Sequence, residues 1–129
     1  MAILAAGARY FAAVFAAGFA LGAIRVGLIA PRLGPTAATL AEIPPMLAWS
    51  WFVCGWALRG LGPAPTRGQR VATGATALLL LLAAEASLAA AVGPGVPGWI
   101  AGMATPAGAL GLAAQLAFAA MPLWRRVSS

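Results

Sequence analysis

The sequence predicts an all-α fold, a polytopic membrane bundle of four helices. Of the 129 residues, 63% are hydrophobic and only 8% are charged, whereas about 25% of the residues in a soluble domain are charged. Apolar segments recur along the chain, and about 20 apolar residues are enough to cross a bilayer. At that span length the chain accommodates four helices and no soluble domain. We therefore expect a single transmembrane domain, 1–129, surrounded by the lipid bilayer.

Missing residue types exclude several kinds of chemistry. The sequence has no His and one Cys, Cys54, which excludes His-based metal or haem ligation and an internal disulfide. The net charge of +6 comes from arginines dispersed along apolar segments, and without a basic run we expect no nucleic-acid binding. We also expect no cofactor, no metal site and no enzymatic activity, because acid–base chemistry would rest on two Glu residues alone.

The first helix is expected at about 2–30, where Pro31 and the pair Gly34–Pro35 end it. Two of its glycines, Gly18 and Gly22, have the GxxxG spacing that lets helices approach closely. We expect these glycines to support helix packing, either inside the protein or between two copies of it.

The second helix is expected at about 36–59 and contains the pair Pro44–Pro45. An interior proline removes a backbone hydrogen bond and crowds the preceding turn. The helix is therefore predicted to be kinked or broken there. Either one kinked helix spans the membrane, or a short helix at 36–43 meets a longer one at 45–59.

The third helix, at about 71–92, follows a loop of Pro, Gly and Arg at 60–70. It contains a run of leucines at 78–82 and one acidic residue, Glu85. A charge-free Gly/Pro turn at 93–98 ends it. This is the clearest of the four predicted spans.

The fourth helix is expected at about 99–124. Within it, Thr105 followed by Pro106 has the pattern of an N-cap and a first helical residue. Two interpretations follow. The helix begins at Pro106 and 99–104 lies at the membrane interface, or the whole segment spans with a kink.

The arginines predict how the chain is oriented. With four spans, the N-terminus, the loop at 60–70 and the C-terminus share one side of the membrane. That side holds most of the arginines: Arg9, Arg59, Arg67, Arg70, Arg125 and Arg126. Because cytoplasmic flanks carry the excess of Lys and Arg, we expect a protein of the bacterial inner membrane with both termini in the cytoplasm.

Three charged side chains fall inside the predicted spans, in the half away from the cytoplasm. Glu85 lies about 21 Å along a helix that starts at residue 71, and Arg25 and Glu42 lie at similar depth. Charges in lipid are costly and usually face the protein interior, so we expect Arg25 to pair with Glu85 or Glu42. The cluster indicates either a proton or cation site, or a structural role in which Arg25 snorkels, Glu42 caps a helix and Glu85 pairs.

Two further residues extend this candidate site. Gln115 lies deep in the last helix, where a buried amide commonly bridges helices. Arg25 and Arg32 are spaced so that they share a face if the helix continues through Pro31. Together they form a possible site for an anion or a lipid headgroup.

Several stretches resemble a group of small, uncharacterised bacterial inner-membrane proteins, and the resemblance covers nearly the whole chain. The stretches are 18–25 (GFALGAIR), 31–34 (PRLG), 42–46 (EIPPM) and 106–111 (PAGALG), together with Gln115 and Pro122. The resemblance implies four helices in the membrane. It implies no activity.

The sequence therefore supports two main functional hypotheses. The first is a homo-oligomeric transporter or channel with the Arg/Glu cluster as its site, which requires a water-accessible cavity at Glu42 and Glu85. The second is an accessory or assembly subunit of a larger membrane complex, in which another protein covers an apolar face such as that of Gly18 and Gly22. A lipid-modifying enzyme is the least favoured, since His, Asp and Lys are missing.

Overall fold

The computed structural model describes residues 2–62 and 64–125, and every regular element in those two ranges is helical. The elements in chain order are α1 (Ala2–Ile24), the π-helical turn η1 (Arg25–Ile29), α2 (Ala30–Leu33), α3 (Pro35–Arg59), α4 (Arg67–Val92), α5 (Gly95–Gly102) and α6 (Pro106–Trp124). The prediction of an all-α fold is thus confirmed for this part of the chain.

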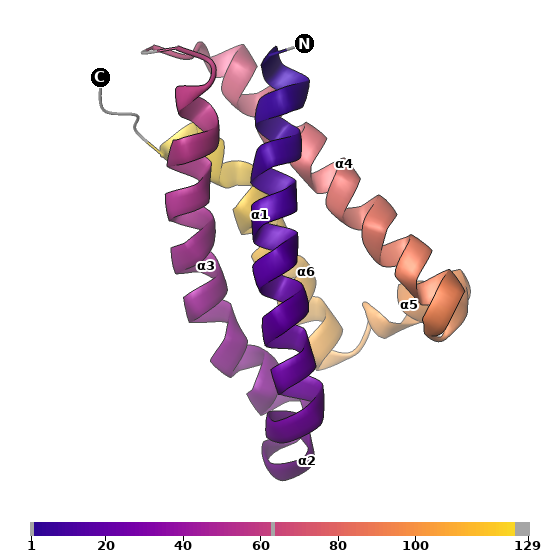
Figure 1. Ribbon diagram of the computed structural model, residues 1–129. Coiled ribbons are helices and arrows are strands. Elements are labelled where there is room, and N and C mark those ends of the chain that lie inside the picture. The colour runs from indigo at the N-terminus through magenta and orange to yellow at the C-terminus, as the bar shows by residue number, and fades with distance from the viewer. Residues whose placement is uncertain (1, 63, 126–129) are drawn as a thin grey trace.

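The long helices α1, α3, α4 and α6 form a ring in which each contacts two neighbours. Helix α1 packs against α3 and α4, and α6 packs against the same two helices on their other side. Figure 1 shows that the N-terminus, the connection between α3 and α4, and the end of α6 lie at one end of the molecule. The short helices α2 and α5 lie toward the opposite end, and α4 leans away from α1 to meet α5.

Three helical segments are long and apolar enough to cross a membrane. They are Ala2–Ile29, Arg67–Ala91 and Pro106–Trp124. The expected fourth span, α3, is a helix of 25 residues but is not one of these three. Its tryptophans, its proline pair and Glu42 lower the hydropathy of its central part.

The Pro44–Pro45 pair does not divide the second helix. The structure has one helix, α3, from Pro35 to Arg59, with both prolines inside it, so the alternative of two separate helices is wrong. Both proline rings are exposed on the outside of the bundle. Because the rings are exposed, they need not displace a packed neighbour, and α3 tolerates the lost backbone hydrogen bonds.

The first helix changes geometry instead of ending at Pro31. A π-helical turn, η1, precedes α2, and α2 continues through Pro31 to Leu33. Proline crowds the carbonyl four residues before it, and the wider π turn lies at that point. The chain leaves the helix at Gly34, whose φ of 87° is in the left-handed region that favours glycine.

Two other helix limits differ from the predicted ones. The segment expected as one helix at 99–124 is two helices, α5 and α6, so the interpretation in which a helix begins at Pro106 is the correct one. The Thr105 hydroxyl accepts a hydrogen bond from the Gly108 amide at 3.0 Å and caps α6. Helix α4 begins at Arg67 rather than residue 71, because Thr66 and Gln69 form a capping box.

The centre of the ring is filled near the end that carries the N-terminus. The Tyr10 hydroxyl of α1 donates a hydrogen bond of 2.6 Å to the Phe118 carbonyl of α6. Their rings stack with centroids 4.2 Å apart, and Tyr10 is fully buried. We call Tyr10 and Phe118 the aromatic seal, because they join two helices that face each other across the ring.

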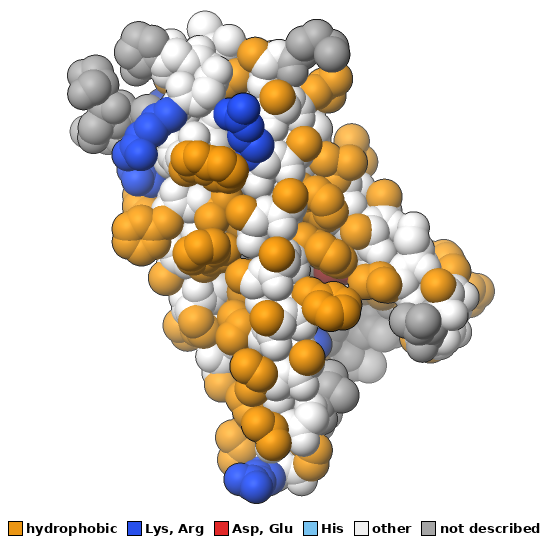
Figure 2. Space-filling model, in the orientation of Figure 1, with side chains coloured by type: hydrophobic (Ala, Val, Ile, Leu, Met, Phe, Trp, Pro, Cys, Tyr) orange, Lys and Arg blue, Asp and Glu red, His pale blue; other side chains and the backbone are white. Residues whose placement is uncertain are grey.

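The outer surface of the bundle is largely apolar. Figure 2 shows hydrophobic side chains along its sides, while arginines gather at the end that carries the N-terminus and one group lies at the opposite tip, over α2. Large side chains such as Phe19, Phe52 and Leu79 are each more than 60% exposed: 63%, 69% and 67%. A surface of this kind requires an apolar surrounding, which together with the three long apolar helices indicates association with a membrane.

Candidate functional site

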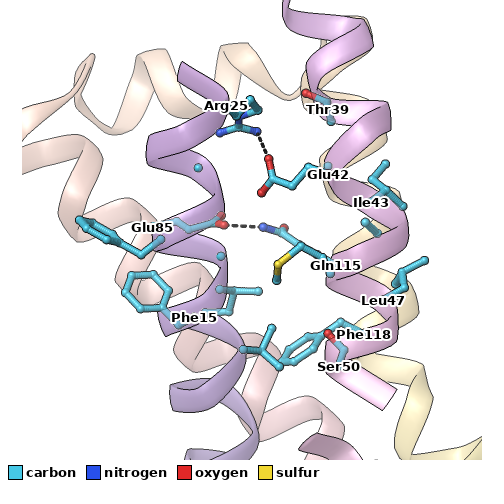
Figure 3. Close-up of a pocket in the computed structure, with 18 of the residues that line it drawn as sticks. Phe15, Arg25, Thr39, Glu42, Ile43, Leu47, Ser50, Glu85, Gln115 and Phe118 are labelled. Atoms are coloured by element: carbon cyan, nitrogen blue, oxygen red, sulfur yellow. Dashed lines mark hydrogen bonds and ion pairs between the residues drawn. The ribbon is translucent and has the colours of Figure 1, made fainter. Parts of the chain in front are cut away.

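A cavity of about 540 Å³ lies between the four long helices, beside the aromatic seal. Most of its wall is apolar and includes Phe15 from α1, Met46 from α3, Leu81 from α4 and Phe118 from α6. Figure 3 shows Arg25, Glu42, Glu85 and Gln115 gathered at the side away from Phe118, whereas Ser50 lies beside Phe118. Polar groups set in an apolar wall are typical of a site that binds small molecules.

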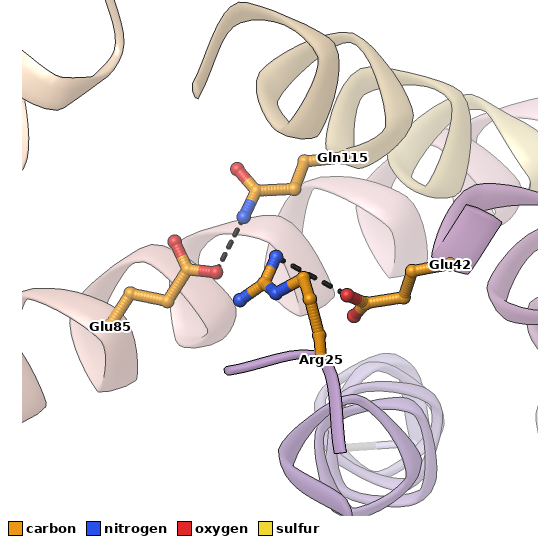
Figure 4. A network of polar contacts seen from close by, with 4 residues as sticks. All are labelled: Arg25, Glu42, Glu85 and Gln115. Atoms are coloured by element: carbon orange, nitrogen blue, oxygen red, sulfur yellow. Dashed lines mark hydrogen bonds and ion pairs between the residues drawn. The ribbon is translucent and has the colours of Figure 1, made fainter. Parts of the chain in front are cut away.

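Each of the four residues predicted from the sequence comes from a different element of the ring. Arg25 is the first residue of η1, Glu42 is in α3, Glu85 is in α4 and Gln115 is in α6. All four line the cavity, and Figure 4 shows their polar ends directed toward one another. Residues as far apart in the sequence as Arg25 and Gln115, which are separated by 90 positions, therefore meet in one network.

Arg25 pairs with Glu42 rather than with Glu85. One guanidinium nitrogen of Arg25 lies 3.2 Å from Glu42 Oε2, and the two side chains are 34% and 16% exposed. The same Oε2 atom is buried and forms no hydrogen bond. The contact is therefore an attraction between charges without the directed geometry of a good hydrogen bond.

Glu85 is held by neutral groups. The Gln115 amide donates a hydrogen bond of 2.5 Å to Glu85 Oε1, and Trp99 of α5 is a second hydrogen-bonding neighbour of the same carboxyl group. An amide and an indole orient a carboxylate, but neither cancels a unit charge. The network therefore contains one guanidinium and two carboxyl groups, and only one of these carboxyl groups has an ionic partner within the part of the chain that the structure describes.

A second cavity of about 610 Å³ adjoins the first and continues under α5. The two cavities share six wall residues: Arg25, Thr39, Glu85, Leu88, Gly111 and Gln115. Trp99 and Met103 belong to the second cavity alone. The Arg25–Glu85–Gln115 group therefore lies at the junction between the chamber beside the aromatic seal and the chamber beneath α5.

The predicted anion or headgroup pair is not assembled in one cavity. Arg25 lines both cavities, whereas Arg32 lies in the last turn of α2, is exposed, and belongs to neither wall. The π turn η1 lies between these two arginines and changes the helical register on which their shared face depended. Arg25 therefore contacts the carboxylate network, and Arg32 is not part of it.

Gly18 and Gly22 also line the first cavity. A Cβ atom added to Gly18 would meet only the Met46 methyl carbon at 3.5 Å, and one added to Gly22 would meet Arg25 at 3.8 Å. Both are ordinary contacts, so close helix packing does not require glycine at either position. Tight approaches between the long helices are instead at Gly7 and Gly74, where an added Cβ would collide with α4 and α6 respectively.

The chemistry of the site is thus that of carboxyl, guanidinium and amide groups. The described residues contain no group of three or more His, Cys, Asp or Glu side chains that could hold a metal ion.

Comparison with known protein families, with curated proteins and with solved structures finds no match to this chain.

Proposed function

We propose that the protein is a small membrane transporter, in which the cavity binds the cargo and Glu85 exchanges a proton for it. The observation that carries the proposal is that two carboxyl groups share a cavity with one arginine, and that this arginine contacts Glu42. Among the residues that the structure describes, the hydrogen-bonding neighbours of Glu85 are Gln115 and Trp99. An unpaired carboxylate in an apolar site carries a large desolvation penalty, which a proton or a bound cation removes.

In this proposal α3 is the fourth span. It lies in the ring between α1 and α6, and the indole N–H of Trp49 is satisfied by the Ala13 carbonyl of α1 at 3.0 Å. Its large apolar residue Phe52 faces outward, as a lipid-facing position requires. A four-span bundle also explains why the N-terminus and the end of α6 lie at the same end of the molecule.

The arginine-rich end is proposed to face the cytoplasm, as the positive-inside rule implies for a protein of a bacterial inner membrane. The described arginines at this end are Arg9, Arg59, Arg67, Arg70 and Arg125, while Arg126 lies outside the described residues. At the opposite end α2 carries Arg32, and α5 carries no charged residue.

Cysteine labelling tests this orientation. A Val96→Cys variant, in exposed α5, is expected to react with a membrane-impermeant maleimide in intact cells. An Ala64→Cys variant, in the exposed connection between α3 and α4, is expected to react only after the cells are opened. The unsubstituted protein is the control, because its Cys54 is fully buried. The reverse labelling pattern would show that the termini face outward.

Transport is tested in liposomes that contain the purified protein and a pH-sensitive dye. Organic cations without a titratable proton, organic anions and neutral solutes of similar size are added outside, one class at a time. A solute that exchanges for protons changes the internal pH, and we expect Glu85→Gln to abolish that change because its amide cannot release a proton. The matched control is Ser87→Ala on the same helix, since Ser87 is exposed and bonds only the Ala83 carbonyl among the hydrogen bonds described.

Two results would overturn the proposal. One is that the unsubstituted protein is folded but none of the three solute classes changes the internal pH. The other is a pH change that survives Glu85→Gln. The accessory-subunit alternative has weaker support, because the Gly18–Gly22 side, its expected contact surface, forms part of the internal cavity wall.

A further inference from the structure

We infer that the cargo is a monovalent organic cation with a bulky apolar body. The inference rests on the proposed function, since it assigns a substrate class to the same cavity. It is carried by three properties of the site: the charge of the wall, the nature of the remaining lining, and the shortage of oxygen ligands. Each property excludes a different class of competing cargo.

The charge of the wall selects the sign and valence of the cargo. Arg25, Glu42 and Glu85 are the charged residues that line the first cavity. With both carboxylates ionised they leave one negative charge, which a single positive charge balances. An anion would be repelled, and a divalent cation would leave an excess positive charge in an apolar site, where the electrostatic penalty is large.

The remaining lining selects an apolar body for that cation. A volume of about 540 Å³ lies inside the range of about 300–1,000 Å³ typical of cavities for small organic ligands. Phe15, Phe19 and Phe118 line it, and aromatic faces attract cations. Met46 adds a flexible side chain that adapts to irregular ligand shapes.

The scarcity of oxygen ligands near Glu85 disfavours Ca²⁺ and Mg²⁺ and favours an organic cation. Hard cations such as Ca²⁺ are bound by about six to eight oxygens, and Mg²⁺ demands nearly ideal octahedral geometry. Near Glu85 the wall provides the amide of Gln115, which already donates its N–H to the carboxylate, and apolar groups such as Leu88. An organic cation needs no such shell, because the carboxylate balances its charge and the apolar wall contacts its apolar body.

The exchange needs no other reactant. The O–H bond of protonated Glu85 breaks, the proton passes to water, and the cation takes its place beside the carboxylate. When the cation leaves, a proton from water restores the neutral acid. Gln115, which bridges Glu85 to α6, orients the carboxyl group in both states.

Tetraphenylphosphonium and tetraphenylborate provide the test, because they have nearly the same size and apolar surface but opposite charge. Binding of each ion to the purified protein in uncharged detergent micelles is measured by calorimetry, with protein-free micelles as the blank. We expect tetraphenylphosphonium to bind, with at least about tenfold weaker affinity for Glu85→Gln, since about 1.4 kcal/mol corresponds to tenfold. Ser87→Ala is expected to bind it as the unsubstituted protein does.

The remaining outcomes separate this inference from the proposed function. Equal affinity for both ions would show an apolar cavity without charge selection and would overturn the inference. So would a Glu85→Gln variant that binds the phosphonium as tightly as the unsubstituted protein does. So would a co-purified lipid, detected by native mass spectrometry, that the phosphonium does not displace. If the liposome assay at the same time shows Glu85-dependent proton exchange driven by an anion or a neutral solute, the transporter proposal stands and only the substrate class is wrong.

Discussion

Gly74→Ala is expected to destabilise the folded protein, although alanine is the better helix former. An added Cβ would overlap the backbone carbonyl oxygen of Ala119 in α6, and a backbone atom cannot rotate away. Helices α4 and α6 would have to separate, and in a membrane their association depends on close van der Waals packing. Overpacking of this kind typically costs about 1–3 kcal/mol.

The matched control for this prediction is Gly68→Ala on the same helix. There an added Cβ meets only the Thr66 hydroxyl at 3.9 Å, so the substitution is expected to be neutral or to stabilise the protein by up to about 1 kcal/mol. Thermal unfolding in detergent, followed by circular dichroism, compares the two variants. A Gly74→Ala protein that unfolds at the same temperature as Gly68→Ala would contradict the α4–α6 contact.

Glu42→Gln is expected to weaken tetraphenylphosphonium binding by at least about tenfold, although Glu85 is intact. Figure 4 shows the Arg25 guanidinium between the two carboxyl groups. Once Glu42 is neutral, Glu85 is the acidic residue left in the cavity wall and Arg25 balances its charge. A cation then no longer finds a net negative site.

A second substitution distinguishes this charge effect from damage to the fold. Adding Arg25→Gln to Glu42→Gln removes the balancing guanidinium, and we expect the double variant to bind the phosphonium more tightly than Glu42→Gln alone. The calorimetric assay measures both variants, and their thermal unfolding shows whether each is folded. If the double variant binds as weakly as the single one, the charge count does not control binding.

The main features of the fold were accessible from the sequence because they depend on hydropathy. The long apolar segments became α1, α4 and α6, and the helical character of α3 was also predicted. The limits of the helices depend on local hydrogen bonds and are harder to predict. The capping box of Thr66 and Gln69 is visible as a sequence pattern, and recognising it would have placed the start of α4 correctly.

The members of the candidate site were predicted, while the sequence left open which of the two carboxyl groups pairs with Arg25. Arg25, Glu42, Glu85 and Gln115 are conspicuous because charged and amide side chains are rare in apolar segments. The choice of Glu42 over Glu85 as partner depends on where η1 directs Arg25, and a proline such as Pro31 does not by itself predict a π-helical turn. The same turn explains why Arg25 and Arg32 do not form a common anion site.

The close glycine contacts and the Tyr10–Phe118 contact between helices were not predicted. Glycine occurs 16 times in the chain, so a GxxxG spacing carries little information here, and the tight positions Gly7 and Gly74 belong to no such pair. Tyr10 is the only tyrosine in the sequence. Its partner is a backbone carbonyl, which every residue possesses, and therefore nothing in the sequence points to Phe118.

In the proposed transporter, the aromatic seal would limit leakage when no cargo is bound. Opening it breaks one buried hydrogen bond, worth about 0.5–1.5 kcal/mol, and one aromatic stack, worth about 0.5–1.5 kcal/mol. Since each 1.4 kcal/mol is about a factor of ten in population, the open form would be rare but would still be reached often by thermal motion. For the proposed transporter, this contact would keep the empty cavity closed most of the time, and cargo would cross only while Tyr10 and Phe118 are apart.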